Sequence, residues 1–437
     1  MLPESFTTCL TQFSLCFTEP TFRRFLTIVT GWVLCTGKRT VTGVIRAAGV
    51  VGERHHSGYH RFFSLARWST DQVGLTLLRL LLSLLPKGAV VCLTVDDTLA
   101  RHTGKHIASG AMHRDPLLST AKMPFFHFGH NWVVLSLVFV FHDWDKVFSL
   151  PVLVRLYRTE KLNKKLGLEH RKKTDLADEM VQLVAQEHPT RPLLLIGDNA
   201  YCNRSIVRPL PQSVDFLGRG RMDAALYAVP PKQFGRGRPR VKGQRVRSPA
   251  ERAEHCPWKK VKTEIYGKPC TVQVQVFDAL WYIVGRGRLM RFFLIRGWSG
   301  HDKDDVLATT DLTMTAPQAI TQYCYRWSEE ETFGWVKSRL GFEDPQNRTE
   351  QAVQRTAPIA LFVYSLVVYW YANRMKRGCS LPIRLAPWYT TKKAPSFSDM
   401  LATLRREAWT IWFSDRASNN RLDQKDLAPL LDAVGYS

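Results

Sequence analysis

The spacing of apolar positions changes several times along the chain, and each change predicts a different kind of structure. Residues 1–88 interleave apolar stretches with basic residues at helical spacing, which predicts a helical N-terminal region. Residues 89–218 carry short apolar runs of strand length, and 219–314 are first basic and irregular and then alternating. Helical spacing returns over 315–345 and continues over 346–437. We therefore expect an α/β protein of several domains, with helical regions at both ends.

Within the N-terminal region, two short helical patterns at 40–48 and 56–65 lie on either side of a glycine-containing break. Such a pair is typical of a helix-turn-helix, which binds DNA through its second helix. His55, Tyr59 and Arg61 would then lie on the exposed side. An ordinary helical bundle with surface histidines accounts for the pattern equally well, and both interpretations stay open.

Two apolar runs of the central part are each followed directly by aspartate. Residues 89–95 (AVVCLTV) precede Asp96 and Asp97, and residues 192–197 (PLLLIG) precede Asp198. The segments between them predict strands at 132–141 and 150–157 and a helix at 174–187. Two buried strands that end in acids, with a helix between them, are typical of an α/β domain whose site lies at strand ends.

The segment 219–247 is strongly basic, with nine lysines or arginines and one acid. Its centre contains Arg236, Arg238 and Arg240 in the sequence GRGRPR, which resembles the Arg-Gly-Arg-Pro hook that lies in the minor groove of A·T-rich DNA. A solvated charged linker is the alternative. The alternating stretches that follow, at 259–266, 271–277, 281–285 and 290–298, predict a small antiparallel sheet.

The segment 323–337 (YCYRWSEEETFGWVK) contains four side chains with hydroxyl or charged groups at helical spacing: Tyr323, Arg326, Glu330 and Lys337. At about 100° per residue they fall within an arc of roughly 60° on one helix, whereas the acids on either side of Glu330 project about 100° away. The apolar run 357–372 that follows is short for a membrane span, so we expect a buried helix there.

The net charge narrows the choice of partner. The chain has 61 lysines and arginines against 38 aspartates and glutamates, a formal net charge of +23. An excess of this size indicates a polyanionic partner, and nucleic acid fits better than an acidic membrane surface. The nine cysteines form no CxxC pair, so neither a disulfide framework nor a zinc site is indicated and an intracellular compartment is expected.

Three carboxylates at these positions predict a metal site. Asp96 (or Asp97), Asp198 and Glu330 cannot all stay ionised side by side without a counter-charge, and hard oxygen ligands suit Mg²⁺ or Mn²⁺. Two such ions would support phosphoryl transfer on a phosphodiester. The phenol and the two cations of the 323–337 segment would hold phosphate oxygens beside the ions.

The arrangement resembles bacterial insertion-sequence transposases of the D-D-E type, which have a ribonuclease H-like core and a Tyr-Arg-Glu-Lys signature. The signature is complete here, as Y323-CY-R326-WSE-E330-ETFGWV-K337, and it follows the words LTVDDT and LLIGDNAY that contain the first two acids. The resemblance covers residues 90–345. It implies an α/β, ribonuclease H-like catalytic core interrupted by a β-rich insertion.

The resemblance also implies cut-and-paste transposition: binding of the element's terminal inverted repeats, metal-dependent cleavage, and joining of the 3′ ends to target DNA. It assigns metal binding to Asp96, Asp198 and Glu330, and DNA-phosphate contact to Tyr323, Arg326 and Lys337. Asp96 is favoured over Asp97 because the family places Thr or Ser two residues after the first acid, as Thr98 stands here.

Several further expectations depend on the same resemblance. Trp258, Trp281 and Trp298 of the expected insertion are either core residues or platforms for an unpaired base. The protein would act on double-stranded DNA as a homodimer, in the cytoplasm at the bacterial nucleoid, and without a membrane partner. A related nuclease without strand transfer and a non-catalytic DNA-binding protein remain alternatives.

Overall fold

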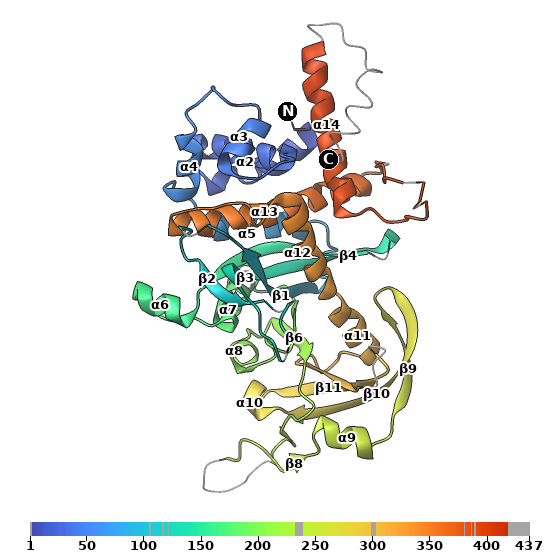
Figure 1. Cartoon of the computed structure of the whole chain (residues 1–437). Coiled ribbons are helices and arrows are strands. Elements are labelled where there is room, and N and C mark those ends of the chain that lie inside the picture. Colours follow the sequence, from blue (N-terminus) through green and yellow to red (C-terminus); the bar gives the residue numbers. More distant parts are fainter. Residues whose placement is uncertain are drawn as a thin grey trace.

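The computed structural model of the chain describes residues 2–104, 106–115, 118–120, 122–144, 146–231, 239–298, 303–379, 381–385, 387–388 and 390–417 (Figure 1). The helices are α1 (Glu4–Thr11), η1 (Ser14–Cys16), α2 (Glu19–Leu34), α3 (Val41–Ala47), α4 (Ser57–Ser64), α5 (Thr70–Leu82), η2 (His142–Trp144), α6 (Glu160–Leu166), α7 (Lys173–Glu187), α8 (Arg204–Val207), α9 (Pro249–His255), α10 (Tyr282–Gly285), α11 (Ala316–Cys324), α12 (Trp327–Leu340), α13 (Glu350–Lys376) and α14 (Phe397–Ala417). The strands are β1 (Val91–Arg101), β2 (Ala111–Arg114), β3 (Phe126–Phe141), β4 (Lys146–Tyr157), β5 (Leu193–Gly197), β6 (Val214–Arg219), β7 (Leu226–Tyr227), β8 (Arg245–Val246), β9 (Lys259–Ile265), β10 (Lys268–Leu280), β11 (Leu289–Arg296) and β12 (Asp305–Thr309).

Twelve strands of the described part form one continuous mixed sheet, in the order β2-β3-β1-β5-β6-β12-β11-β10-β7-β8, with β4 beside β3 and β9 beside β10. β1, β5 and β6 run parallel, whereas β1, β3 and β4 pair antiparallel. The strands predicted at 89–95, 132–141, 150–157 and 192–197 and the helix predicted at 174–187 are confirmed as β1, β3, β4, β5 and α7. The mixed α/β class is confirmed with them.

The predicted antiparallel strands at 259–266, 271–277 and 290–298 are also confirmed, as β9, β10 and β11. The strand predicted at 281–285 is wrong, because Tyr282–Gly285 is the helical turn α10. Strands β9, β10 and β11 pair antiparallel as predicted, but they are part of the large sheet rather than a small one. β12 pairs with β6 at Leu307↔Arg219. Strands β9 to β12 therefore extend the central sheet (Figure 1, yellow).

Helix α13 runs through the middle of the protein between the N-terminal helices and the sheet (Figure 1). Among the described residues it is the one helix long and apolar enough to cross a membrane, but 89% of its apolar window is buried inside the protein. The predicted buried helix is therefore confirmed. Its Arg355 is also buried and donates to the backbone carbonyls of Phe63 in the last turn of α4 and of Ala66 and Trp68 just after it.

The two N-terminal helical patterns are confirmed as α3 and α4. α3 packs closely on α2, because a Cβ on Gly31 would lie 2.0 Å from the Val44 carbonyl oxygen. The expected exposure of Tyr59 is wrong: only 4% of it is accessible, since its ring joins the common hydrophobic core. His55 and Arg61 are exposed as expected.

Candidate active site

The first acids stand in the middle of a strand rather than at its end. β1 continues through Asp96 and Asp97 to Arg101, so the predicted end at Asp96 is wrong. The reason is the long neighbouring strand β3, which pairs with β1 as far as Arg101↔Gly129 and supplies partners for its backbone beyond the acids. Asp96 and Asp97 consequently point to opposite faces of the sheet.

The two faces give the two aspartates different partners. Asp97 Oδ2 accepts from Lys173 Nζ at the start of α7 at 2.6 Å, and its Oδ1 accepts from the Tyr201 hydroxyl at 3.4 Å. Asp96 Oδ2 accepts from Nη1 of Arg326, beside α12, at 2.9 Å. Only Asp96 therefore faces the segment that carries the third acid.

Asp198 follows the last residue of β5, as predicted. The parallel pairing of Gly197 with Val95 brings it alongside Asp96. Its Oδ1 accepts from the backbone N–H groups of Ala200 and Tyr201 at 2.8 and 3.3 Å, which fixes the carboxylate at the turn. Burial, the charge of Asp97 and the charge of Asp198 raise the pKa of Asp96 to about 7, against the lowering effect of Arg326.

The predicted single helix over 323–337 is wrong, because the helix is interrupted. α11 ends at Cys324 and α12 begins at Trp327, with Tyr325 and Arg326 at the junction. Tyr323 is consequently on one helix, whereas Glu330 and Lys337 are on the next. Because of the interruption, Arg326 lies at the start of α12, where its guanidinium reaches Asp96 of β1.

Arg326 connects the first and third acids. Its Nη1 contacts Asp96, and its Nη2 lies 3.1 Å from Glu330 Oε1. Burial alone lowers the pKa of Arg326, but Asp96, Tyr323, Glu330 and Asp198 surround it and hold its pKa above the ordinary value. The guanidinium is therefore a permanent positive charge among the three predicted acids.

The acids beside Glu330 are used elsewhere, as the helical wheel predicted. Glu329 is fully buried, and its Oε1 accepts from the Ser136 hydroxyl at 2.9 Å. Burial raises the pKa of Glu329 well above its usual value, so this side chain is neutral. Glu331 pairs with Lys146 at 2.8 Å on the other side of α12.

Tyr323 joins the acid cluster, but Lys337 does not. The half-buried Tyr323 ring meets Trp298 edge-on at a centroid distance of 5.4 Å, and burial raises the pKa of its hydroxyl to about 12. Burial lowers the pKa of Lys337. The charged groups that act on this side chain include Glu343 and Arg101, which lie near the C-terminal end of α12, whereas Glu330 lies in its first turn.

Comparison with known families agrees with this arrangement. A family model described as DDE superfamily endonuclease matches residues 12–274, which is more than half of the 437 residues. The chain belongs to this family. The match contains Asp96 and Asp198 and ends before Glu330. No curated protein matches the chain.

This DDE endonuclease is thus an enzyme whose substrate is DNA. Within the described residues, no three His, Cys, Asp or Glu side chains are grouped closely enough to hold a metal ion. The donor set nevertheless fits one chemically: Asp96, Asp198 and Glu330 offer carboxylate oxygens, the ligands that Mg²⁺ and Mn²⁺ prefer. Burial and then the charges of Asp97 and Asp198 raise the pKa of Asp96, and a bound cation would favour its ionised form.

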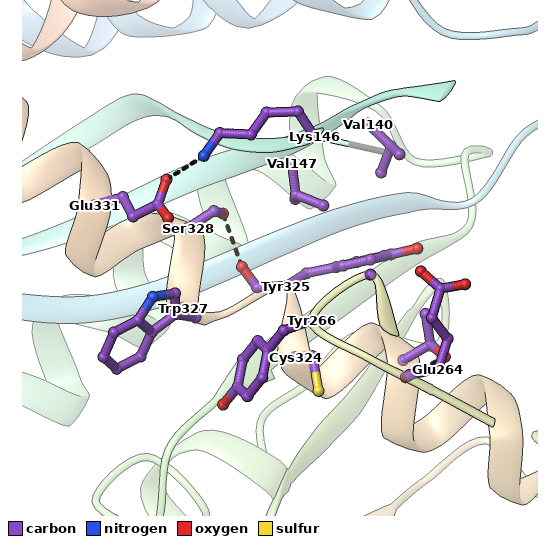
Figure 2. A pocket seen from close by; sticks show the side chains of 12 residues that line it. Val140, Lys146, Val147, Glu264, Tyr266, Cys324, Tyr325, Trp327, Ser328 and Glu331 are labelled. Carbon is purple, nitrogen blue, oxygen red and sulfur yellow. Dashed lines mark hydrogen bonds and ion pairs between the residues drawn. The ribbon is translucent and has the colours of Figure 1, made fainter. Parts of the chain in front are cut away.

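A pocket of about 320 Å³ lies on the outer side of the α11–α12 junction, between the β3–β4 and β9–β10 hairpins (Figure 2). Its lining includes Tyr266 and Trp327, whose ring centroids are 6.3 Å apart, and the Lys146–Glu331 ion pair.

The three tryptophans of the expected insertion differ in burial. Trp281 is core, with 4% of its surface accessible, whereas Trp258 and Trp298 are half-buried. The core interpretation therefore holds fully for Trp281, and Trp258 and Trp298 pack against the edges of the two hydrophobic clusters.

Of the predicted minor-groove arginines, Arg240 is exposed in the endonuclease, while Arg236 and Arg238 lie outside the described residues. The sequence interpretation overlooked Lys173 and Tyr201, which hold Asp97. Tyr201 is the last letter of LLIGDNAY and could have been noticed there. Lys173 carries no signal beyond its place in the basic run 171–173.

Proposed function

We propose that this endonuclease is a transposase of the insertion-sequence type. It binds the terminal inverted repeats of its own element, cleaves them by metal-dependent phosphoryl transfer and joins the 3′ ends to target DNA. The observation that carries the proposal is the contact of one guanidinium with both Asp96 and Glu330, at 2.9 and 3.1 Å. These are the first and third acids of the motif, and Asp198 adjoins them through the β1–β5 pair.

We infer that the sheet from β4 to β6 is the ribonuclease H-like core expected from the resemblance. Its order is β4-β3-β1-β5-β6, with Asp96 on β1 and Asp198 just after the adjacent parallel strand β5. Strands β9, β10 and β11 lie between Asp198 and Glu330 in the chain and correspond to the expected β-rich insertion.

Asp96, Asp198 and Glu330 would hold two divalent ions, Mg²⁺ or Mn²⁺. Such ions, when bound, supply Lewis-acid activation of the attacking oxygen and neutralise the leaving oxygen. Arg326 balances the charge of Asp96 and Glu330 and is close enough to turn to a phosphate oxygen when DNA enters. Tyr323 and Lys337 extend the phosphate contacts along the two helices.

The remaining partners follow from the same proposal. The basic segment with Arg236, Arg238 and Arg240 contacts the DNA backbone, and α3 with α4 contributes to recognition of the repeat. Coordinated cutting of two ends requires two active sites, so the protein acts as a homodimer on DNA. It works at the bacterial nucleoid.

The test is incubation of the protein with duplexes that carry the inverted repeats flanking its gene, in Mg²⁺, with and without target DNA. Wild type should cleave and join, Glu330→Gln should bind without cleaving, and the matched control Glu331→Gln should cleave. Cleavage by Glu330→Gln would overturn the site. Cleavage by wild type without joining would indicate a nuclease, and binding without any cleavage a non-catalytic DNA-binding protein.

A further inference from the structure

A second pocket, of about 330 Å³, opens where the start of α7 meets α8. Its lining is polar throughout and contains three cations and no carboxylate: Lys172, Lys173, Thr174, Asn203, Arg204 and Ser205. None of these residues belongs to the Tyr-Arg-Glu-Lys signature or to the acid motifs.

Two of the three cations are available to a ligand. Lys172 and Arg204 are exposed, and neither forms an ion pair with another described residue. The neighbouring basic pocket differs, since Arg155 and Arg171 there both pair with Glu179. Lys172 and Arg204, which have no ion-pair partner among the described residues, therefore distinguish the α7–α8 pocket from the pocket around Glu179.

The pocket lies near the turn that carries Asp198, and on the face of β1 that Asp97 occupies rather than the face of Asp96. Lys173 is a lining residue, and its Nζ lies 2.6 Å from Oδ2 of Asp97, the residue next to Asp96. Tyr201 connects the same aspartate to Asp198: its hydroxyl donates to Asp97 Oδ1, and its backbone N–H donates to Asp198 Oδ1. The turn that carries Asp198 thus leads within five residues to Asn203 in the pocket lining.

We propose that the α7–α8 pocket binds a backbone phosphate of the DNA strand, beside the phosphate that is cleaved. Lys172 and Arg204 supply the positive charge, and the Thr174 and Ser205 hydroxyls supply further donors. The lining has no aromatic ring to stack on a base, so the pocket takes the sugar-phosphate backbone irrespective of sequence. This inference rests on the proposed function and adds a positioning contact to it.

The experiment compares Lys172→Ala, Arg204→Ala and the double variant, each in the Glu330→Gln background so that DNA stays uncut. Lys87→Ala is the matched control, because it removes one exposed cation that lies before the start of β1 and outside the pocket lining. Binding to the terminal-repeat duplex is measured over a range of salt concentrations. The double variant should lower the slope of log K against log salt by about 0.9, the loss of one phosphate contact, and should bind on the order of tenfold more weakly, with each single variant between it and the control.

Ethylation interference then locates the contact. Ethylation of one phosphate next to the cleaved bond should weaken binding of the Glu330→Gln protein and leave the double variant unaffected, because that variant has already lost the contact. Rescue by Lys172→Arg with Arg204→Lys should restore the interference.

An unchanged salt slope and an unchanged interference pattern in the double variant, with wild type still cleaving, would overturn the inference and leave the proposed function intact. Loss of interference only at phosphates far from the cleaved bond would overturn it as well. If wild type neither binds nor cleaves the duplex, the proposed function itself fails.

Discussion

Nη1 of Arg326 lies 2.9 Å from Oδ2 of Asp96, although 230 positions separate the two residues in the chain. The same guanidinium contacts Glu330, so one side chain sets the positions of two acids on different elements. Replacing it should therefore affect catalysis more than folding.

Arg326→Gln should reduce single-turnover DNA cleavage by roughly 100-fold to 1000-fold, the usual cost of removing one electrostatic group from a reacting centre. Arg326→Lys keeps the charge but cannot reach both acids, so it should fall between wild type and Gln. Lys146→Gln breaks the ion pair of Glu331 on the same helix and should cleave at the wild-type rate. An Arg326→Gln protein as fast as this control would contradict the role of Arg326.

In the absence of divalent metal, the free energy of unfolding should fall as the pH rises from about 4 to about 7. Burial raises the pKa of Asp96 to about 7 from its ordinary value of 3.8, so over this window the folded state binds a proton that the unfolded state has released. The loss from this group is about 4 kcal/mol at most. Urea unfolding at several pH values should show Asp96→Asn gaining stability relative to wild type as the pH rises.

Magnesium should reverse that loss in wild type at high pH and have no such effect on Asp96→Asn, because the ion binds the ionised carboxylate. A pH profile of unfolding that is the same in both proteins would contradict the raised pKa.

The adjacent acids Glu329 and Glu330 should respond to substitution in opposite ways. Glu329 is buried and neutral, so Glu329→Gln preserves its shape and charge state and should change the free energy of unfolding by less than about 1 kcal/mol, with cleavage retained. Glu329→Ala leaves a cavity and an unpaired Ser136 hydroxyl, which should cost about 2–4 kcal/mol. Glu330→Gln should keep its stability and lose cleavage. Loss of cleavage in Glu329→Gln with normal unfolding would reverse the assignment of the two acids.

Arg355 should be one of the most sensitive positions for stability. Its guanidinium donates to three backbone carbonyls at and after the end of α4 and lies 4.7 Å from the centroid of the Trp68 ring. Arg355→Met leaves those buried carbonyls without donors and should cost roughly 3 kcal/mol in chemical denaturation. Arg348→Met, before the start of α13, is the control and should unfold like wild type.

The sequence was sufficient to predict which acids lie near one another, because their spacing is local and specific; their catalytic role stays a prediction. Strand-length apolar runs located Asp96 and Asp198, and helical spacing separated Glu330 from its neighbours. The break between α11 and α12 was not predictable in the same way. Tyr325 and Arg326 keep helical backbone angles, with φ of −59° and −54°, so neither glycine nor proline marks the junction.

Long-range pairing explains the other differences. β1 continues past its acids only because β3 is there to pair with it, and β6 joins the later strands only because β12 returns beside it. Tyr59 carries a polar group on an aromatic ring, and its burial depends on the aromatic cluster that the tertiary structure assembles around Phe62 and Trp68. The division of the chain into five domains stays a prediction.

The N-terminal helices α1 and α2 contact α13 and the end of α12, and this packing limits how the protein could be re-engineered. Phe6 of α1 packs against Trp370 of α13, and the Trp32 indole N–H donates to the Leu340 carbonyl at the end of α12. A graft that replaced residues 1–88 to change the recognised DNA would remove part of the support for the helix that carries Glu330. New specificity is better sought by exchanging exposed side chains such as His55 and Arg61 on an intact scaffold.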